Sequence, residues 1–93
     1  MLLFEWDSGN IDHLTVHDIT PREAEEVINN EPLDLDAQIR GNEERFTQVG
    51  ETAEGRILIV ITTWRGEKLR VVTAYPAKTR FRKIYLAHKG MDS

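Results

Sequence analysis

The sequence predicts an α+β domain in which helices pack on an antiparallel sheet, and three stretches support this prediction. Residues 57–61 form an unbroken apolar run rich in β-branched side chains, typical of a strand covered on both faces. In residues 69–74, the side chains at odd positions (Leu, Val, Thr) alternate with those at even positions (Arg, Val, Ala), which predicts a neighbouring strand. Residues 77–88 change to helical spacing and carry many basic side chains. The expected architecture is a central meander, two N-terminal helices and a basic C-terminal helix.

The length and composition are those of a single soluble domain. A chain of 93 residues supports one domain, residues 1–93, with one modest core. Cysteine is absent, which excludes disulfides, thiolate metal sites and cysteine nucleophiles. Acidic residues occur too early for a signal peptide, and no apolar run approaches membrane-spanning length. We therefore expect a cytoplasmic protein without a membrane partner.

Charge is divided unevenly along the chain. Residues 1–44 hold twelve acids and two bases, whereas residues 45–93 hold four acids and ten bases; the resulting charges of −10 and +6 give the net −4. A basic second half can present a surface that binds nucleic acid. The same pattern also fits a folded monomer in which the acidic half simply neutralises the basic half.

The first third of the chain predicts a strand and two helices. Residues 2–6 form a short strand, and the N-cap candidates that follow predict a helix at about 10–17. The second helix, residues 21–29, begins at a capping box in which Thr20 is the N-cap and Glu23 is the third helical residue.

The two histidines of the first predicted helix lie one turn apart. His13 and His17 could together bind a metal, but two ligands with no cysteine and no third histidine nearby make a poor site. We expect no specific metal site there, and no cofactor.

The rest of the chain predicts the sheet and the last helix. Residues 32–42 are either an edge strand or an extended loop, and residues 44–50 form a strand. Residues 56–75 form a hairpin in the middle of the sheet, with Gly66 in its tight turn and a last helix at 78–89. In the second strand of this hairpin, Leu69, Val71 and Thr73 are expected to alternate with Arg70, Val72 and Ala74. The predicted core contains Val27, Ile28, Ile59, Ile61, Val71, Phe81 and Ile84.

Four cations are the candidate functional residues. Arg45 starts a strand, Arg70 lies within a strand, and Lys78 and Arg80 stand at the start of the last helix. Cations there oppose the helix dipole, so a bound phosphate would relieve the mismatch. An arginine inside a strand has three fates: solvent, a carboxylate or a ligand phosphate. A shared phosphate and salt bridges to the acidic half both remain open. Trp64 and Tyr75 are either base-stacking aromatics or ordinary sheet residues.

Several pieces of the chain follow, in order, the pattern of one known family. The pieces are FEWD at 4–7, HDITPREA at 17–24, ERF and VG within 44–50, RVVTA at 70–74, and AK at 77–78 before a basic helix that contains Tyr85. In these pieces the chain resembles the BrnT family of bacterial toxins. The resemblance implies a RelE-like fold and a ribonuclease that a cognate antitoxin neutralises.

The resemblance also implies a mechanism. RNA would be cleaved without a metal, by attack of a ribose 2′-hydroxyl on its own phosphate. Arg45, Arg70, Lys78 and Arg80 would stabilise the charge of the transition state. His17 or Glu44 would transfer protons. The expected partners are an RNA substrate and the antitoxin, with dimerisation inside the antitoxin complex.

Three positions depart from the family pattern. Val16 stands where a lysine is common, Tyr75 where an arginine is common, and Phe81–Arg82 where the final helix usually has a glutamate. These changes affect acid–base and charged groups more than fold. The sequence therefore leaves a second function open, that of a non-catalytic BrnT-like module for protein interaction.

Overall fold

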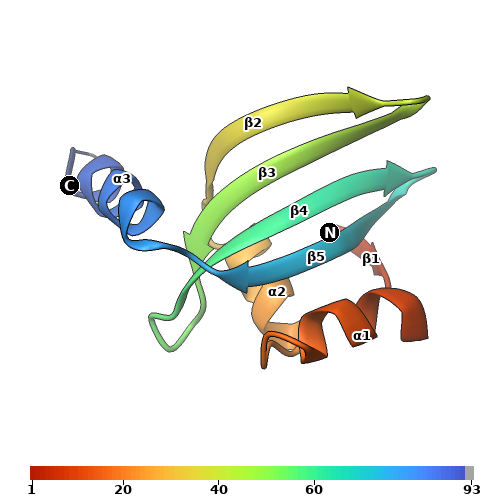
Figure 1. The fold of residues 1–93 in the computed structure, drawn as a ribbon, viewed down its shortest axis with the longest axis horizontal. Coiled ribbons are helices and arrows are strands. Elements are labelled where there is room, and N and C mark those ends of the chain that lie inside the picture. The colour runs from red at the N-terminus through yellow and green to blue at the C-terminus, as the bar shows by residue number, and fades with distance from the viewer. Residues whose placement is uncertain (92–93) are drawn as a thin grey trace.

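The computed structural model describes residues 1–91, which form one five-stranded sheet and three helices (Figure 1). Residues 92–93 of the predicted domain lie outside the described part. The strand order is β1-β5-β4-β3-β2. The strands are β1 (Leu3–Glu5), β2 (Leu33–Arg40), β3 (Glu43–Glu51), β4 (Ile57–Arg65) and β5 (Lys68–Pro76). The helices are α1 (Ser8–Thr15), α2 (Pro21–Asn29) and α3 (Thr79–Met91).

The predicted hairpin in the middle of the sheet is confirmed, because β4 is the third of the five strands and β5 lies beside it. Apolar side chains of β4 are buried on both faces, as the unbroken apolar run predicts. Gly66 in the tight turn has a φ of 61°, a conformation that glycine adopts without strain. The segment left open between strand and loop is the edge strand β2.

The sheet is mixed, so the prediction of an antiparallel sheet is wrong at one edge. Strand β1 runs parallel to β5, with Leu3 opposite Lys68 and Glu5 opposite Arg70. The other neighbours are antiparallel because short turns join them. No short turn links β1 to β5, so local sequence does not dictate its direction.

A β-bulge at Val72 corrects the predicted alternation along β5. Thr62 pairs with Val71, whereas Ile61 pairs with Thr73, so Val72 is an extra residue without a partner on β4. Beyond it, Thr73 lies on the same face as Arg70, and Ala74 lies on the face of Val71. The prediction that Val71 and Thr73 share one face, and Arg70 and Ala74 the other, is therefore wrong.

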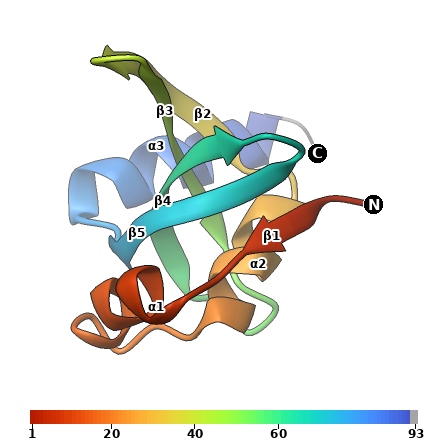
Figure 2. The same ribbon diagram turned by 90° about the vertical axis from the view of Figure 1, so that its right-hand side faces the viewer.

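Two capped helices lie together on one side of the sheet (Figure 2). The capping box of α2 is confirmed, since the Thr20 side chain accepts from the Glu23 backbone N–H and the Glu23 carboxylate accepts in return. Helix α1 starts earlier than predicted because Asp7 is the residue that caps it, accepting from the backbone of Gly9 and Asn10. Within residues 1–91, every helix is too short or too polar to cross a membrane.

The core has one cluster on each face of the sheet. On the face that we call the helix face, Leu58 and Val60 pack with side chains of α1 and α2. On the opposite face, called the open face, α3 covers the part around Val49 and Ile59. Residues on the helix face are Leu14, Ile19, Ala24, Val27, Leu58, Val60, Val71 and Ala74, and those under α3 are Val49, Ile57, Ile59, Ala77 and Tyr85.

The predicted core is correct for most members and wrong for one. Val27, Ile59 and Val71 are buried, and Ile28, Ile61 and Phe81 are partly buried. Ile84 is 41% exposed, because α3 packs on the sheet through Phe81 and Tyr85, one turn apart. Each residue advances about 100° around a helix, so Ile84 lies off that contact line.

Candidate functional site

Two arginines come together on the open face of the sheet. Arg45 of β3 and Arg70 of β5 both pair with Thr63 of β4, so all three side chains share one face. Neighbouring strands are ~4.8 Å apart, which puts the two arginine Cα atoms about 10 Å from each other. Side chains as long as arginine can reach one phosphate across this distance.

A cavity of about 240 Å³ lies where these arginines meet the start of α1. We call it the arginine cavity. Its walls come from α1, β3, β4 and β5, which are brought together by the sheet order. The residues that line it are Gly9, Asn10, His13, Glu43, Arg45, Arg65, Arg70 and Val72. The bulged residue of β5 is therefore part of the site.

Arg70 is held by carboxylates of the acidic first half. Its Nη1 donates to Glu5 Oε1 at 2.9 Å and to Asp7 Oδ2 at 2.8 Å, and its Nη2 donates to Asp7 Oδ1 at 3.1 Å. The side chain is 17% exposed. Of the three fates open to a strand arginine, pairing with carboxylates is the one observed. These contacts fasten β1 and the start of α1 to β5 and use three of the five guanidinium donors.

The guanidinium of Arg45 makes fewer contacts within the protein than that of Arg70. Its Nε lies 3.6 Å from Glu43 Oε1, and Arg65 Nη2 lies 3.9 Å from the same oxygen. Arg45 Nε and Glu43 Oε1 are buried, yet neither makes a hydrogen bond. Arg45 thus has one long ion pair and no hydrogen bond, whereas Arg70 makes three hydrogen bonds, so a ligand anion entering the cavity would gain more at Arg45.

The structure adds His13 to the site, a residue that sequence reasoning considered only as a metal ligand. His13 lines the arginine cavity, where it is the one imidazole among the lining residues. Asn10 on the same helix face is buried, and its amide donates to the backbone oxygens of Glu5 and Val71. The spacing of Gly9, Asn10 and His13 on one helix face was the available signal.

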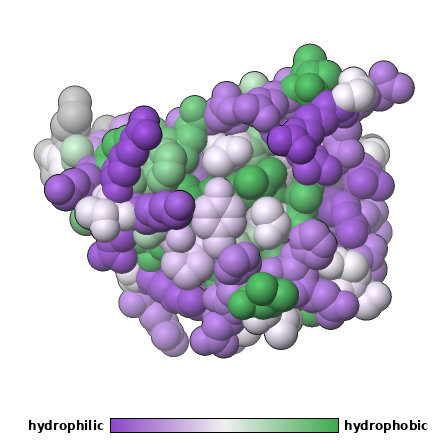
Figure 3. All heavy atoms as spheres, viewed as in Figure 1, coloured by the Kyte–Doolittle hydropathy of each residue, from purple (hydrophilic) through white to green (hydrophobic). Residues whose placement is uncertain are grey.

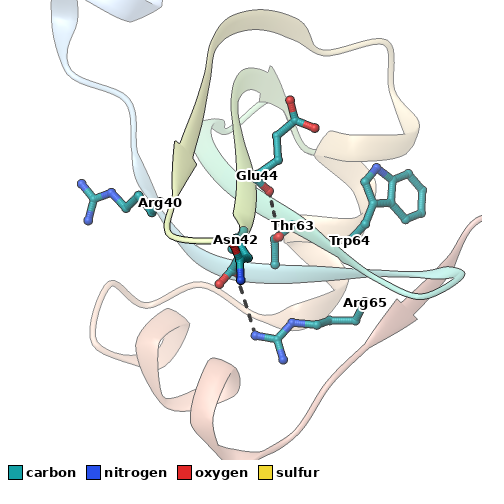
Figure 4. A pocket seen from close by; sticks show the side chains of 7 residues that line it. Arg40, Asn42, Glu44, Thr63, Trp64 and Arg65 are labelled. Carbon is teal, nitrogen blue, oxygen red and sulfur yellow. Dashed lines mark hydrogen bonds and ion pairs between the residues drawn. The ribbon is translucent and has the colours of Figure 1, made fainter.

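His17 and Glu44 do not line the arginine cavity. The His17 ring stands 5.9 Å from the ring of Tyr75, beyond the end of α1. Glu44 points to the helix face and lines another pocket, of about 570 Å³, with Trp64 and Arg65 (Figure 4). Figure 4 shows the Glu44 carboxylate pointing away from Arg65, while the Glu44 backbone oxygen accepts from the Thr63 hydroxyl at 2.8 Å.

Lys78 and Arg80 stand at the other end of β5 from Arg70. Lys78 precedes α3, and the Arg80 guanidinium lies 5.5 Å from the centre of the Phe81 ring. Arg70 and Pro76 are six positions apart along β5, a length of about 20 Å. The four cations therefore form two groups, Arg45 with Arg70 and Lys78 with Arg80, with Arg65 joining the first.

Metal ligands do not gather in the described part of the chain. Residues 1–91 contain no group of three or more histidine, aspartate or glutamate side chains placed to hold a metal ion. The expectation that His13 and His17 bind no metal stays a prediction.

The ion pair between Asp7 and Arg70 predicts a loss of stability in acid. The hydrogen bond from Arg70 is the main cause that lowers the pKa of Asp7 from 3.8 to about 2. A carboxylate with a lowered pKa stabilises the fold above its ordinary pKa and loses this effect as the pH falls through the lowered value. We therefore expect Asp7→Asn to lower the free energy of unfolding near pH 5, and the deficit to shrink between about pH 4 and 2.

Denaturant unfolding of both proteins across this pH range measures the effect. Asparagine still caps a helix, so the substitution removes the charge and keeps the cap. A deficit that does not change with pH would show that the charge of Asp7 does not stabilise the fold.

The chain matches the model of a known protein family. A family model described as "Ribonuclease toxin, BrnT, of type II toxin-antitoxin system" matches residues 6–80. This range includes α1, all strands except β1, and every residue that lines the arginine cavity. No curated protein sequence matches the chain closely enough to count as a relative.

Proposed function

The chain belongs to the BrnT family of ribonuclease toxins of type II toxin–antitoxin systems, and from this premise we propose that it cleaves RNA at the arginine cavity without a metal ion. A cognate antitoxin would hold it inactive by covering the open face of the sheet. The antitoxin and the RNA are the two partners that this proposal requires.

The proposed reaction needs three kinds of group around one phosphate. A base removes the proton of the 2′-hydroxyl, whose oxygen attacks the adjacent phosphorus, and the bond from phosphorus to the 5′-oxygen breaks. An acid protonates the leaving 5′-oxygen, which gives a 2′,3′-cyclic phosphate and a 5′-hydroxyl. Cations stabilise the negative charge that accumulates on the phosphate oxygens in the transition state.

The observation that carries the proposal is the pair of arginines beside a histidine. Arg45 and Arg70 flank Thr63 on the open face, and His13 lines the same cavity. Arginine binds phosphate oxygens through two donors at once, and imidazole transfers protons near neutral pH. His13 is therefore a better supported proton-transfer group than His17 or Glu44, which lie outside this cavity.

The direct test is cleavage of a short RNA by the purified chain in the presence of a strong chelator. We expect products that end in a 2′,3′-cyclic phosphate, and no cleavage when one nucleotide of the substrate is 2′-deoxy at the scissile position. Cleavage that the chelator abolishes would contradict the metal-free mechanism. Cleavage of the 2′-deoxy substrate would contradict attack by the 2′-hydroxyl.

A non-catalytic interaction module is the second candidate, and the ion pairs of Arg70 favour it. A guanidinium bound to both Glu5 and Asp7 is already neutralised, so a phosphate gains less there than at an unpaired arginine. This candidate predicts that the wild-type chain leaves RNA intact and does not inhibit growth when expressed alone. Growth arrest together with RNA cleavage would exclude it.

A further inference from the structure

Strand β2 leaves its outer edge without a neighbouring strand in the described chain. An edge strand presents unpaired backbone N–H and C=O groups that can pair with another chain. Every residue from Asp36 to Arg40 is exposed, and Ile39 is 75% exposed. Figure 3 shows hydrophobic side chains, in green, at the upper border of the molecule over the end of β2.

The exposed part of β2 is also its regular part. A bulge interrupts the pairing with β3 between Asp34 and Asp36. From Asp36, opposite Thr47, to Arg40, opposite Glu43, the register runs without interruption. Bulges discourage edge pairing, so the strand is protected at its first residues and open over its last five.

The sequence of these five residues, DAQIR, is complementary to itself. When two copies run antiparallel around Gln38, Asp36 of each copy faces Arg40 of the other, and Ala37 faces Ile39. The strand register puts Asp36 and Arg40 on the open face of the sheet and Ala37 and Ile39 on the helix face. Two ion pairs would thus form on one face and two apolar pairs on the other, which is the arrangement that stabilises neighbouring strands.

We propose that β2 is a self-association strand, which pairs with β2 of a second copy of this chain through residues 36–40. The two five-stranded sheets then join into one sheet of ten strands. A two-fold axis perpendicular to the sheet keeps the faces in register, so both arginine cavities open on the same side. A pairing of five residues covers little surface, so the dimer depends on protein concentration.

The charge pattern gives a test that separates this contact from other associations. Asp36→Arg places two arginines opposite each other in a homodimer, and Arg40→Asp places two aspartates opposite each other. Each variant alone is expected to stay near the monomer mass of 10.7 kDa at concentrations where the wild type dimerises. Mixed together, the two variants restore both ion pairs, so they are expected to form a heterodimer. Light scattering after size-exclusion chromatography measures each case.

Matched controls change the same charges elsewhere. Glu67→Arg in the turn between β4 and β5, and Arg82→Asp on α3, are exposed and are expected to dimerise like the wild type. A wild-type chain that remains monomeric at every concentration would overturn the proposal. Dimers of both single variants, or a mixture that remains monomeric, would overturn it as well.

A disulfide at the axis provides an independent check. The chain has no cysteine, so Gln38→Cys introduces a single thiol that would face its own copy across the two-fold axis. We expect rapid disulfide-linked dimer under mild oxidation, and little dimer from Glu67→Cys under the same conditions. Equal rates for the two variants would show random collision and contradict pairing at β2. Neither experiment requires RNA cleavage, so its result is independent of the catalytic proposal.

Discussion

Replacing Arg45 with alanine is expected to lower the rate constant of RNA cleavage by roughly 10² to 10³, the usual effect of removing one preorganised donor to transition-state charge. The loss should appear mainly in kcat, because the charge on the phosphate grows between the bound state and the transition state. Arg45 is a cleaner probe than Arg70. Its one observed partner is Glu43 at 3.6 Å, so the fold should survive the substitution.

Two further variants make this measurement decisive. Lys78→Ala removes a cation from beyond the other end of β5 and should reduce kcat much less than Arg45→Ala does. If all four cations instead surrounded one phosphate, the two variants would lose similar fractions of kcat. His13→Ala should lower the rate and change its dependence on pH, which a purely structural role would not do. Unchanged cleavage by a folded Arg45→Ala protein would remove the arginine cavity as the site.

Replacing Ile59 with alanine is expected to lower the free energy of unfolding by about 2 to 5 kcal/mol. Ile59 is 1% exposed in the middle strand, where it packs under α3 with Val49 and Tyr85. The surrounding sheet is hydrogen-bonded on both sides and cannot close around the missing atoms. The total free energy of unfolding of a small domain is about 5 to 15 kcal/mol, so this loss is a large fraction of the stability.

Ile84→Ala is the matched control for that experiment. It deletes the same atoms from a side chain that is 41% exposed, and alanine favours a helix. Denaturant unfolding should show a much smaller change for Ile84→Ala at an unchanged slope. Equal losses for the two variants would mean that the middle of the sheet is not the main source of stability.

Local sequence patterns predicted the parts of the fold that local interactions determine. In the capping box, the side chains of Thr20 and Glu23 accept hydrogen bonds from each other's backbone N–H groups, and Gly66 determines the turn between β4 and β5. The direction of β1 and the bulge at Val72 depend on which distant residues become neighbours. Such pairing follows from the assembled sheet and leaves no periodic signal in the sequence.

The candidate site was predictable only in part for the same reason. Arg45 and Arg70 were singled out as strand cations, and both line the cavity. The partners of Arg70, which are Glu5 and Asp7, lie 65 and 63 positions away, so the sequence offered only an excess of acids. His13 was visible as a histidine one turn from His17. Its place beside Arg70 depends on how α1 packs along β5.

The parallel pairing of β1 with β5 also determines when the arginine cavity can form. A ribosome releases β1 and α1 first, whereas Arg70 is 65 residues further along the chain than its partner Glu5. Contacts between such distant positions form late, because the long loop between them must first close. The nascent chain therefore carries the wall of the cavity that holds His13 well before it carries Arg70. The arginine cavity can form only after the ribosome has synthesised β5, so incomplete chains that end in β4 lack the cavity.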